Sequence, residues 1–361
     1  MAFSDRISAV VVNLAVWMEG RVLAVRCFLR LLILVRDTFY VSGRHLYDHC
    51  GERTVLRGVN KMAGYSGDDP TCLHIFPEIR RTGANVVRIV WLTETSQFPK
   101  ATVANLDAVI TNCRAQDMIP MIELHDATAG PESPFSKLGL LVKYWTRPDV
   151  VAVLKKHSQY LLLNIGNEVG DDTVTDADYV QGYKNAIAAI RGTGVKVPLV
   201  IDAAGFGQET RYILNNAATL LSTDPQRNLM FSLHVWWHFH ANAIADFTKA
   251  VRDVVNARIP FLVGEFAGVC QKCDNTNNDA PFAEILNLCE ENSIGWIVWE
   301  WGPGNEFGDP PCPAMNITSD GTYAGVQPGW ASSVVNDHPF SLKNRSVRPY
   351  SMVNHGRCVC P

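Results

Sequence analysis

The sequence has little charge and no excess of either sign. Asp, Glu, Lys and Arg make up only 19% of its 361 residues, and 32 basic residues against 36 acidic ones give a formal charge of −4. A nucleic-acid-binding surface needs a basic excess, so that class of partner is not expected. A hydrophobic content of 47% is too high for a disordered chain and requires a large buried core. The composition therefore favours a globular protein with a neutral or weakly charged partner.

Uncharged apolar runs long enough to cross a membrane, about 18 residues, are missing. The run ISAVVVNLAVWM, residues 7–18, has the length of the apolar part of a secretory signal. The charges before it balance, however, and no clean cleavage site follows it. We therefore treat residues 1–37 as a leader outside the fold: a secretory signal, an amphipathic arm or the product of a misplaced start codon.

The glycine-rich motifs G-x-G-x-x-G and G-x-x-x-x-G-K-[ST] are also absent, and doubly wound nucleotide-binding sheets often carry them. Eight short runs rich in Val, Ile and Leu are present instead, separated by segments with the three-to-four spacing of amphipathic helices. The runs are TVLRGV (54–59), NVVRIVW (85–91), MIPMIEL (118–124), YLLLNIG (160–166), VPLVID (197–202), LMFSLHVW (229–236), PFLVGEF (260–266) and IGWIVWEW (294–301). Eight strands alternating with helices predict a (β/α)8 TIM barrel, with a doubly wound α/β sheet as the alternative.

No linker or change of composition divides the barrel region, so we predict one catalytic domain over residues 38–340 and a tail over 341–361. Residues 39–60 alternate short apolar stretches with turn clusters. This pattern predicts a small hairpin, resembling a lid over the mouth of the barrel, that leads into the first strand.

Cysteine is abundant, with ten residues, and that number favours an exported protein with disulfides. Cys270 and Cys273 form a C-x-x-C motif, which we interpret as a loop-bracing disulfide, with a zinc site as the alternative. Cys72 and Cys113 fall in successive predicted helical segments and are a possible second pair.

Active sites of such barrels lie at the carboxyl ends of the strands, so the polar and aromatic residues there are the candidates. They are Arg88, Trp91, His125, Asp126, Asn167, Glu168, His234, Trp236, Trp237, Glu265, Trp299, Glu300 and Trp301. Trp91, Trp237 and Trp301 fit a core position as well as a site position. Two carboxylates supported by Arg, His and Asn and surrounded by Trp are typical of a sugar-cleaving site.

Glycosidic cleavage requires one carboxyl group that is protonated and one that is ionised. We predict that Glu265 is the ionised nucleophile, since Arg88 can lower its pKa. Glu168 is then the acid and later the base, and Asn167 is placed to hydrogen-bond a sugar hydroxyl. Indole rings such as that of Trp299 offer flat platforms for sugar rings.

The strings FYVSG, LRGVN, VVRIVW, IELHDATAG, LLLNIGNEVG, NLMFSLHVW, LVGEFAG and WEWGPGN occur in this order. The chain resembles glycoside hydrolase family 5 over about residues 38–305, and within it the bacterial β-mannanases. The resemblance implies a (β/α)8 barrel and retaining endo-hydrolysis of a β-1,4-linked polysaccharide. By position it implies that Glu168 is the acid/base and Glu265 the nucleophile. The supporting residues that it implies are Arg88, His125, Asn167, His234 and Trp299.

One position departs from the pattern of the family. Many members have His-x-Tyr in the sixth strand, with the Tyr hydroxyl bonded to the nucleophile, whereas this chain has His234-Val235-Trp236. An indole N–H donates but does not accept hydrogen bonds. Trp236 either replaces the Tyr as donor or lines a sugar subsite.

The leading interpretation is a secreted, monomeric endo-β-1,4-mannanase that needs no cofactor or metal. Mannan and glucan differ by one axial hydroxyl, so an endo-β-1,4-glucanase of the same family is the nearest alternative. A barrel that binds carbohydrate but has lost turnover is the alternative from another class, and Trp236 is the feature that favours it.

Overall fold

A computed structural model describes residues 36–93, 95, 97–128, 134–237, 240–269, 281–305 and 311–358. Eight parallel strands close into a barrel in chain order, with the last strand paired to the first. The strands are β4 (Arg57–Lys61), β5 (Val86–Trp91), β6 (Ile119–Leu124), β7 (Leu162–Asn164), β8 (Leu199–Asp202), β9 (Leu229–His234), β10 (Phe261–Glu265) and β11 (Gly295–Val298). Each begins within one of the eight predicted runs. The (β/α)8 barrel is confirmed, and its closure excludes an open doubly wound sheet.

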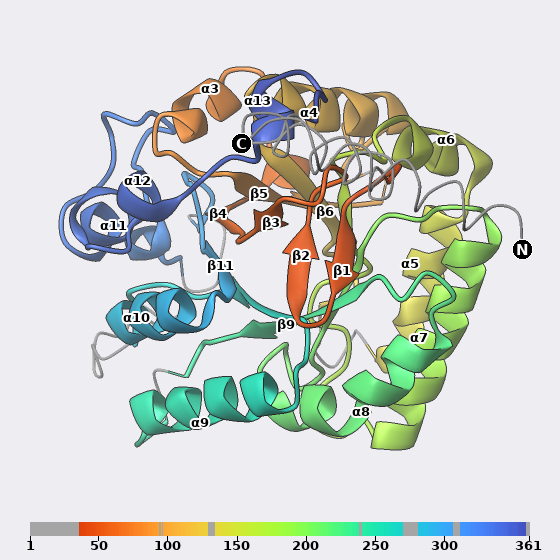
Figure 1. The fold of residues 1–361 in the computed structure, drawn as a ribbon. Coiled ribbons are helices and arrows are strands. Elements are labelled where there is room, and N and C mark those ends of the chain that lie inside the picture. Colours follow the sequence, from red (N-terminus) through yellow and green to blue (C-terminus); the bar gives the residue numbers. More distant parts are fainter. Residues whose placement is uncertain are drawn as a thin grey trace, which may run out of the picture.

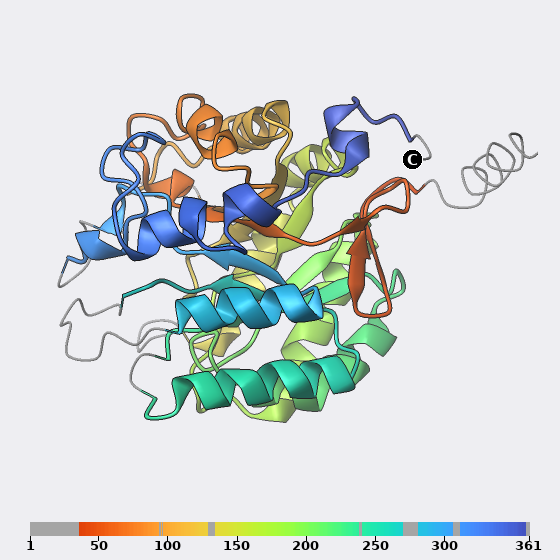
Figure 2. The same cartoon turned by 60° about the vertical axis from the view of Figure 1, so that its left-hand side comes forward.

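Helices form a ring outside the strands (Figures 1 and 2). They are α3 (Ile75–Arg80), α4 (Val103–Ala115), α5 (Leu138–Trp145), α6 (Pro148–Lys156), α7 (Asp176–Gly192), α8 (Thr210–Thr223), α9 (Ala243–Asn256) and α10 (Phe282–Asn292). The side chains of Thr102 and Thr175 cap α4 and α7 by accepting a hydrogen bond from the backbone three residues later. In α9 the residues Phe247, Val251 and Val254 recur at helical spacing and are buried.

The strands are nearly continuous apolar runs because both of their faces are buried. In β5, the side chains of Val87, Ile89 and Trp91 belong to the large core shared with the helices. The alternate residues, Arg88 and Val90, therefore face the inside of the barrel. This parity decides which residues of a strand can take part in a site.

The predicted hairpin is present as a three-stranded antiparallel sheet of β1 (Tyr40–Ser42), β2 (His45–Tyr47) and β3 (Arg53–Thr54). Phe39 and Leu46 share a buried cluster with first residues of the strands, such as Val86 and Ile119. The hairpin thus closes the amino-terminal end of the barrel (Figure 1). The expectation of a lid over the mouth is wrong, because the active site belongs to the opposite end.

Shorter helices lie around the barrel and in the carboxyl-terminal part of the chain. They are η1 (Ala63–Tyr65), η2 (Phe135–Lys137), η4 (Pro313–Met315), α11 (Trp330–Ser332), the π-helical turn η5 (Ser333–Asp337), α12 (Leu342–Arg345) and α13 (Tyr350–Val353). Leu342 and Met352 are buried in the two main cores. A disulfide joins Cys50 to Cys358, 308 residues apart. The segment set apart as a tail therefore packs on the barrel as far as residue 358.

Among the other cysteines of the described ranges, Cys72, Cys113 and Cys289 are free and buried, and Cys312 is disulfide-bonded. The expected bridge between Cys72 and Cys113 is therefore wrong for this structure. Cys270 and Cys273, for which a disulfide was predicted, lie outside the described residues.

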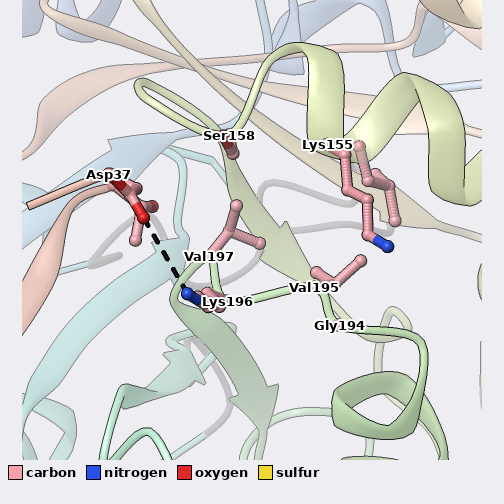
Figure 3. A pocket seen from close by; sticks show the side chains of 9 residues that line it. Asp37, Lys155, Ser158, Gly194, Val195, Lys196 and Val197 are labelled. Carbon is pink, nitrogen blue, oxygen red and sulfur yellow. Dashed lines mark ion pairs between the residues drawn. The ribbon is translucent and has the colours of Figure 1, made fainter.

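A cavity of about 200 Å³ opens beside the start of the described chain (Figure 3). Its lining comes from residues 154–158 and 194–197, which precede β7 and β8, and from Asp37, which pairs with Lys196 at 3.8 Å. The cavity therefore lies at the amino-terminal end of these strands, away from the catalytic candidates. None of the helices built from the described residues has the length and apolar character of a membrane span.

Candidate active site

Arg88 lies at the centre of the candidate site, fully buried inside the barrel. Its Nη1 donates to Oε1 of Glu265 at 2.7 Å and to Oδ1 of Asn60 at 3.1 Å. Its Nη2 donates to Oδ1 of Asn167 at 2.7 Å, and its Nε to Oδ1 of Asn164 at 2.9 Å. One guanidinium thus fixes side chains from β4, β7 and β10 relative to one another.

Glu265 ends β10 immediately after an irregularity in the strand. The pairing of β10 with β9 shifts register there, so that Gly264 is passed over and Glu265 lies opposite His234. Such a bulge changes the direction of a side chain. A Cβ on Gly264 would lie 2.2 Å from Oγ of Ser232 and 2.9 Å from Nε2 of His234, so only glycine fits. The Nε1 of Trp236 donates to Oε2 of Glu265 at 3.2 Å.

Glu168 follows β7 and is 7% exposed. Its backbone has φ +45°, a left-handed conformation that costs free energy for a residue with a side chain. The backbone N–H of Glu168 donates to Oδ2 of Asp202 at 3.1 Å, which holds this turn. Its Oε1 lies 2.7 Å from Nδ1 of His234, and the same nitrogen lies 3.5 Å from Oε2 of Glu265. His234 therefore contacts both carboxyl groups.

The two carboxyl groups titrate in different ranges. Burial raises the pKa of Glu168 well above its usual range, and the nearby charges of Glu265 and Asp202 raise it further. Burial also raises the pKa of Glu265, to about 7, but Arg88 and His125 act in the opposite direction. As expected, Arg88 lowers the pKa of Glu265. Burial raises this pKa by more, so the net shift is upward. Glu265 is thus the group that ionises first, and Glu168 is the one that keeps its proton.

His125 and Asn167 line the same site from β6 and the end of β7. The Nδ1 of His125 lies 2.9 Å from Oε1 of Glu123, and Glu123 raises the pKa of this imidazole against the opposing effect of burial. The Nδ2 of Asn167 donates to Oγ1 of Thr128 at 2.9 Å and lies 3.4 Å from Nε2 of His125. These contacts orient the two side chains without using Glu168.

Two of the candidate tryptophans belong to the site. Trp236 and Trp299 share a small cluster with Val90 at the carboxyl ends of the strands, and their rings meet edge to face. The ring of Trp299 lies nearly parallel to that of His125, with centroids 6.0 Å apart. The Nε1 of Trp299 donates to Asn305 at 3.1 Å.

Other candidates from the sequence lie away from the site. Trp91, Trp237 and Trp301 pack in the large core between strands and helices, so the core alternative applies to all three. The carboxylate of Asp126 accepts from the backbone and hydroxyl of Thr93 and serves the loop after β5.

The sequence analysis missed four polar residues that face the inside of the barrel: Asn60, Glu123, Asn164 and Asp202. All four are fully buried. Asp202 is the last residue of the predicted strand 197–202. The search for polar residues at the carboxyl ends of strands could therefore have found it. Glu123, one residue inside its strand, has the parity of Met121 and faces inward with it.

The side chains of Glu168, His234 and Glu265 each offer one ligand atom within 4.8 Å of the others, a spacing compatible with a metal ion. Both oxygens of Glu265 already accept hydrogen bonds, one from the Arg88 cation. A cation at this place would oppose the guanidinium, so the donor set fits a shared proton better than a metal.

Comparison with known proteins identifies the family to which this barrel belongs. The family model described as Cellulase (glycosyl hydrolase family 5) matches residues 47–305. A mannan endo-1,4-beta-mannosidase of Salipaludibacillus agaradhaerens is 31% identical over 264 residues, which cover 73% of this chain and 81% of that protein. A mannan endo-1,4-beta-mannosidase of Cellvibrio japonicus is 27% identical over 301 residues, 83% of this chain, which spans 66% of that protein's length.

Among solved structures, a mannotriose complex of the Thermomonospora fusca beta-mannanase superposes with a TM-score of 0.76 at 27% identity. The alignment covers 88% of this chain and all of that one. The family model matches well over half of the chain, and the barrel places the two strand-end glutamates together inside it. The chain belongs to glycosyl hydrolase family 5.

Proposed function

We propose that the protein is a retaining endo-β-1,4-mannanase, with Glu265 as nucleophile and Glu168 as acid/base. The observation that carries the proposal is that a carboxylate oxygen of Glu168 and one of Glu265 lie within 4.8 Å. Retaining pairs have carboxyl groups about 5 to 5.5 Å apart, whereas inverting pairs need about 6.5 to 9.5 Å to admit a water molecule. The close spacing supports direct attack by one carboxylate.

In the first step the ionised Glu265 attacks the anomeric carbon and forms a glycosyl ester. The bond to the leaving oxygen breaks, and Glu168 gives that oxygen its proton. In the second step the ionised Glu168 takes a proton from water, the hydroxide attacks the anomeric carbon, and Glu265 leaves as a carboxylate. Arg88 and Trp236, which each donate to one oxygen of Glu265, stabilise the charge that returns to it.

The substrate is proposed from the relatives, since the carboxylate pair serves mannan and glucan alike. Two of the similar proteins are named for mannan, and a similar structure holds mannotriose. The indole of Trp299, which stacks on His125 at the carboxyl ends of the strands, is the aromatic ring that we propose for contact with a sugar. A β-1,4-glucan remains the alternative substrate.

The experiment is reducing-sugar release by the purified chain from glucomannan, galactomannan and a soluble β-1,4-glucan, with Glu265→Ala as control. We expect release from both mannans that disappears in the control. Preference for the glucan would replace the substrate and keep the mechanism. Binding without release from any of the three by the folded protein would leave the carbohydrate-binding alternative.

We also propose that the protein is exported. The Cys50–Cys358 disulfide supports this, because such bonds persist in oxidising compartments. Amino-terminal sequencing of protein recovered from the medium of an expressing culture tests the proposal. Recovery only from inside the cells would contradict it.

A further inference from the structure

Asp202, the last residue of β8, makes several contacts inside the site. Its Oδ2 accepts from the backbone N–H of Glu168 at 3.1 Å and from Nη2 of Arg88 at 3.4 Å. Its Oδ1 accepts from Nδ2 of Asn164 at 3.1 Å. These donors satisfy an ionised carboxylate. Burial raises the pKa of Asp202 above its usual value, although Arg88 and the N–H of Glu168 act in the opposite direction.

His234 lies between Asp202 and Glu168. Its Nδ1 is 2.7 Å from Oε1 of Glu168, and its Nε2 is 3.5 Å from Oδ2 of Asp202. Burial, Arg88 and His125 all lower the pKa of this imidazole, well below its usual value. His234 is therefore neutral and carries a single proton, which is either on Nδ1 or on Nε2.

We propose that Asp202 is a positioning residue that fixes the proton of His234 on Nε2 and thereby keeps the acid form of Glu168. This inference rests on the proposed function, since it concerns the acid of that reaction. At 3.5 Å, Nε2 of His234 makes no hydrogen bond within the described residues, so Asp202 acts on it through charge. An Nε2 lone pair would be repelled by the Asp202 carboxylate, whereas an Nε2–H is attracted to it. With the proton on Nε2, Nδ1 presents a lone pair to Oε1 of Glu168. A protonated Glu168 can donate to that lone pair, and an ionised one is repelled by it.

The same arrangement serves the second half of the reaction. After Glu168 has given its proton to the leaving group, its carboxylate faces the Nδ1 lone pair and is a stronger base toward water. The proton of His234 stays on Nε2 throughout, so Asp202 exchanges no proton. It acts through its own charge near Glu168, through His234 and through the backbone of Glu168.

The direction of a charge-removing substitution follows from the groups around Glu168. They are Arg88 from β5, Glu123 from β6, Asp202 from β8, His234 from β9 and Glu265 from β10. In Asp202→Asn the negative charge is lost, and with it the preference for Nε2–H. Both changes favour ionised Glu168, so the pKa of Glu168 falls. Loss of positioning alone would lower the rate and leave the pH dependence in place.

The first measurement is the pH profile of kcat/KM on a soluble mannan for the wild type, Asp202→Asn and Asp202→Glu. The alkaline limb reports the acid group of the free enzyme. We expect it to move to lower pH by about one unit in Asp202→Asn. Asp202→Glu keeps the charge and should retain the limb of the wild type. An unmoved limb in Asp202→Asn would overturn the proposal.

Asp224→Asn is the matched control, since it also removes a buried carboxylate. Asp224 lies between α8 and β9, before the amino-terminal end of that strand, and pairs with Arg191 at 2.8 Å. We expect a loss of stability in this variant with both limbs of the profile unchanged. If the alkaline limb moved equally in Asp202→Asn and Asp224→Asn, the shift would be an effect of general destabilisation and the proposal would fail.

The second measurement depends neither on activity nor on the Asp202 variants. Nitrogen-15 NMR of the wild-type protein, with the signal of His234 assigned from a His234→Ala sample, distinguishes the two neutral forms. Nε2–H is expected, and Nδ1–H would refute the proposal. If the wild type hydrolysed no polysaccharide, the proposed function would fail, while this spectrum would still decide the state of His234.

Discussion

The indole N–H of Trp236 donates to Oε2 of Glu265 over 3.2 Å. The other oxygen of this carboxylate accepts from Arg88 over 2.7 Å. Each oxygen of Glu265 thus has its own donor, one neutral and one charged. Of the two interpretations that the sequence left open for Trp236, the geometry corresponds to the donor.

Trp236→Phe tests this hydrogen bond, because it removes the donor and keeps an aromatic ring. A hydrogen bond to a charged group contributes about 1.5 to 3 kcal/mol, so we expect kcat/KM to fall by about ten- to a hundredfold. The acid limb of the pH profile should move to higher pH, since ionised Glu265 has lost a donor. Steady-state kinetics on a soluble mannan measures both effects. A higher KM with an unchanged acid limb would indicate a sugar subsite instead.

The raised pKa of Glu265 predicts how stability depends on pH. Its ordinary value is 4.5 and its value in the folded protein is about 7. Between these values the folded state keeps a proton that the unfolded state has lost, so the free energy of unfolding decreases as pH rises from about 4.5 to about 7. The contribution of this group is on the order of 1 to 3 kcal/mol.

Thermal unfolding at several pH values checks this prediction against Glu265→Gln. The variant should lose part of the decrease in melting temperature between pH 5 and pH 7, the rest coming from Glu168 and other groups. Parallel curves for the wild type and the variant would show that Glu265 has an ordinary pKa in the folded protein.

Gly264→Ala should inactivate the enzyme without unfolding it. The added Cβ would come within 3 Å of Ser232 and His234. To relieve these contacts, His234 must move away from Glu168, or the bulge that directs Glu265 must change. We expect a loss of kcat of at least about a hundredfold, in line with small misplacements of catalytic groups. Circular dichroism checks that the barrel persists, and near-normal kcat would contradict the role given to the bulge.

The Cys50–Cys358 disulfide is expected to affect stability and leave catalysis unchanged. It ties the carboxyl-terminal segment to the hairpin side of the barrel, at the end opposite the site. Replacing both cysteines by serine should cost about 2 to 5 kcal/mol of unfolding free energy. Chemical denaturation measures the loss, and kcat below the melting transition should equal that of the wild type. A changed kcat would show that strain at one end reaches the other.

The barrel could be predicted because its strands are buried on both faces and therefore read as continuous apolar runs. The carboxylates of Glu168 and Glu265 could be found because each follows or ends such a run. The position of the hairpin could not, since its turn pattern does not say which end of the barrel it covers. That depends on long-range contacts such as those of Asn228, which bonds the backbone of Phe39 and Val41.

Strand parity explains which of the candidate tryptophans lie in the site and which lie in the core. Residues 88 and 90 face inward, so Trp91 must face the helices, and the same alternation puts Trp299 inside and Trp301 outside. Applied to the predicted strands, this rule would have separated these residues. The proton on Nε2 of His234, by contrast, depends on two side chains from other strands, and no local pattern contains it.

The hairpin and the disulfide also determine at which end of the barrel the described chain begins and ends. The backbone N–H of Arg36 donates a hydrogen bond to the carbonyl oxygen of the hairpin residue His49, and a disulfide joins Cys358 to Cys50. Both ends of the described chain therefore lie at the amino-terminal end of the barrel. A tether fixed at residue 36 or at residue 358 would therefore hold the barrel by the end opposite Glu168 and Glu265.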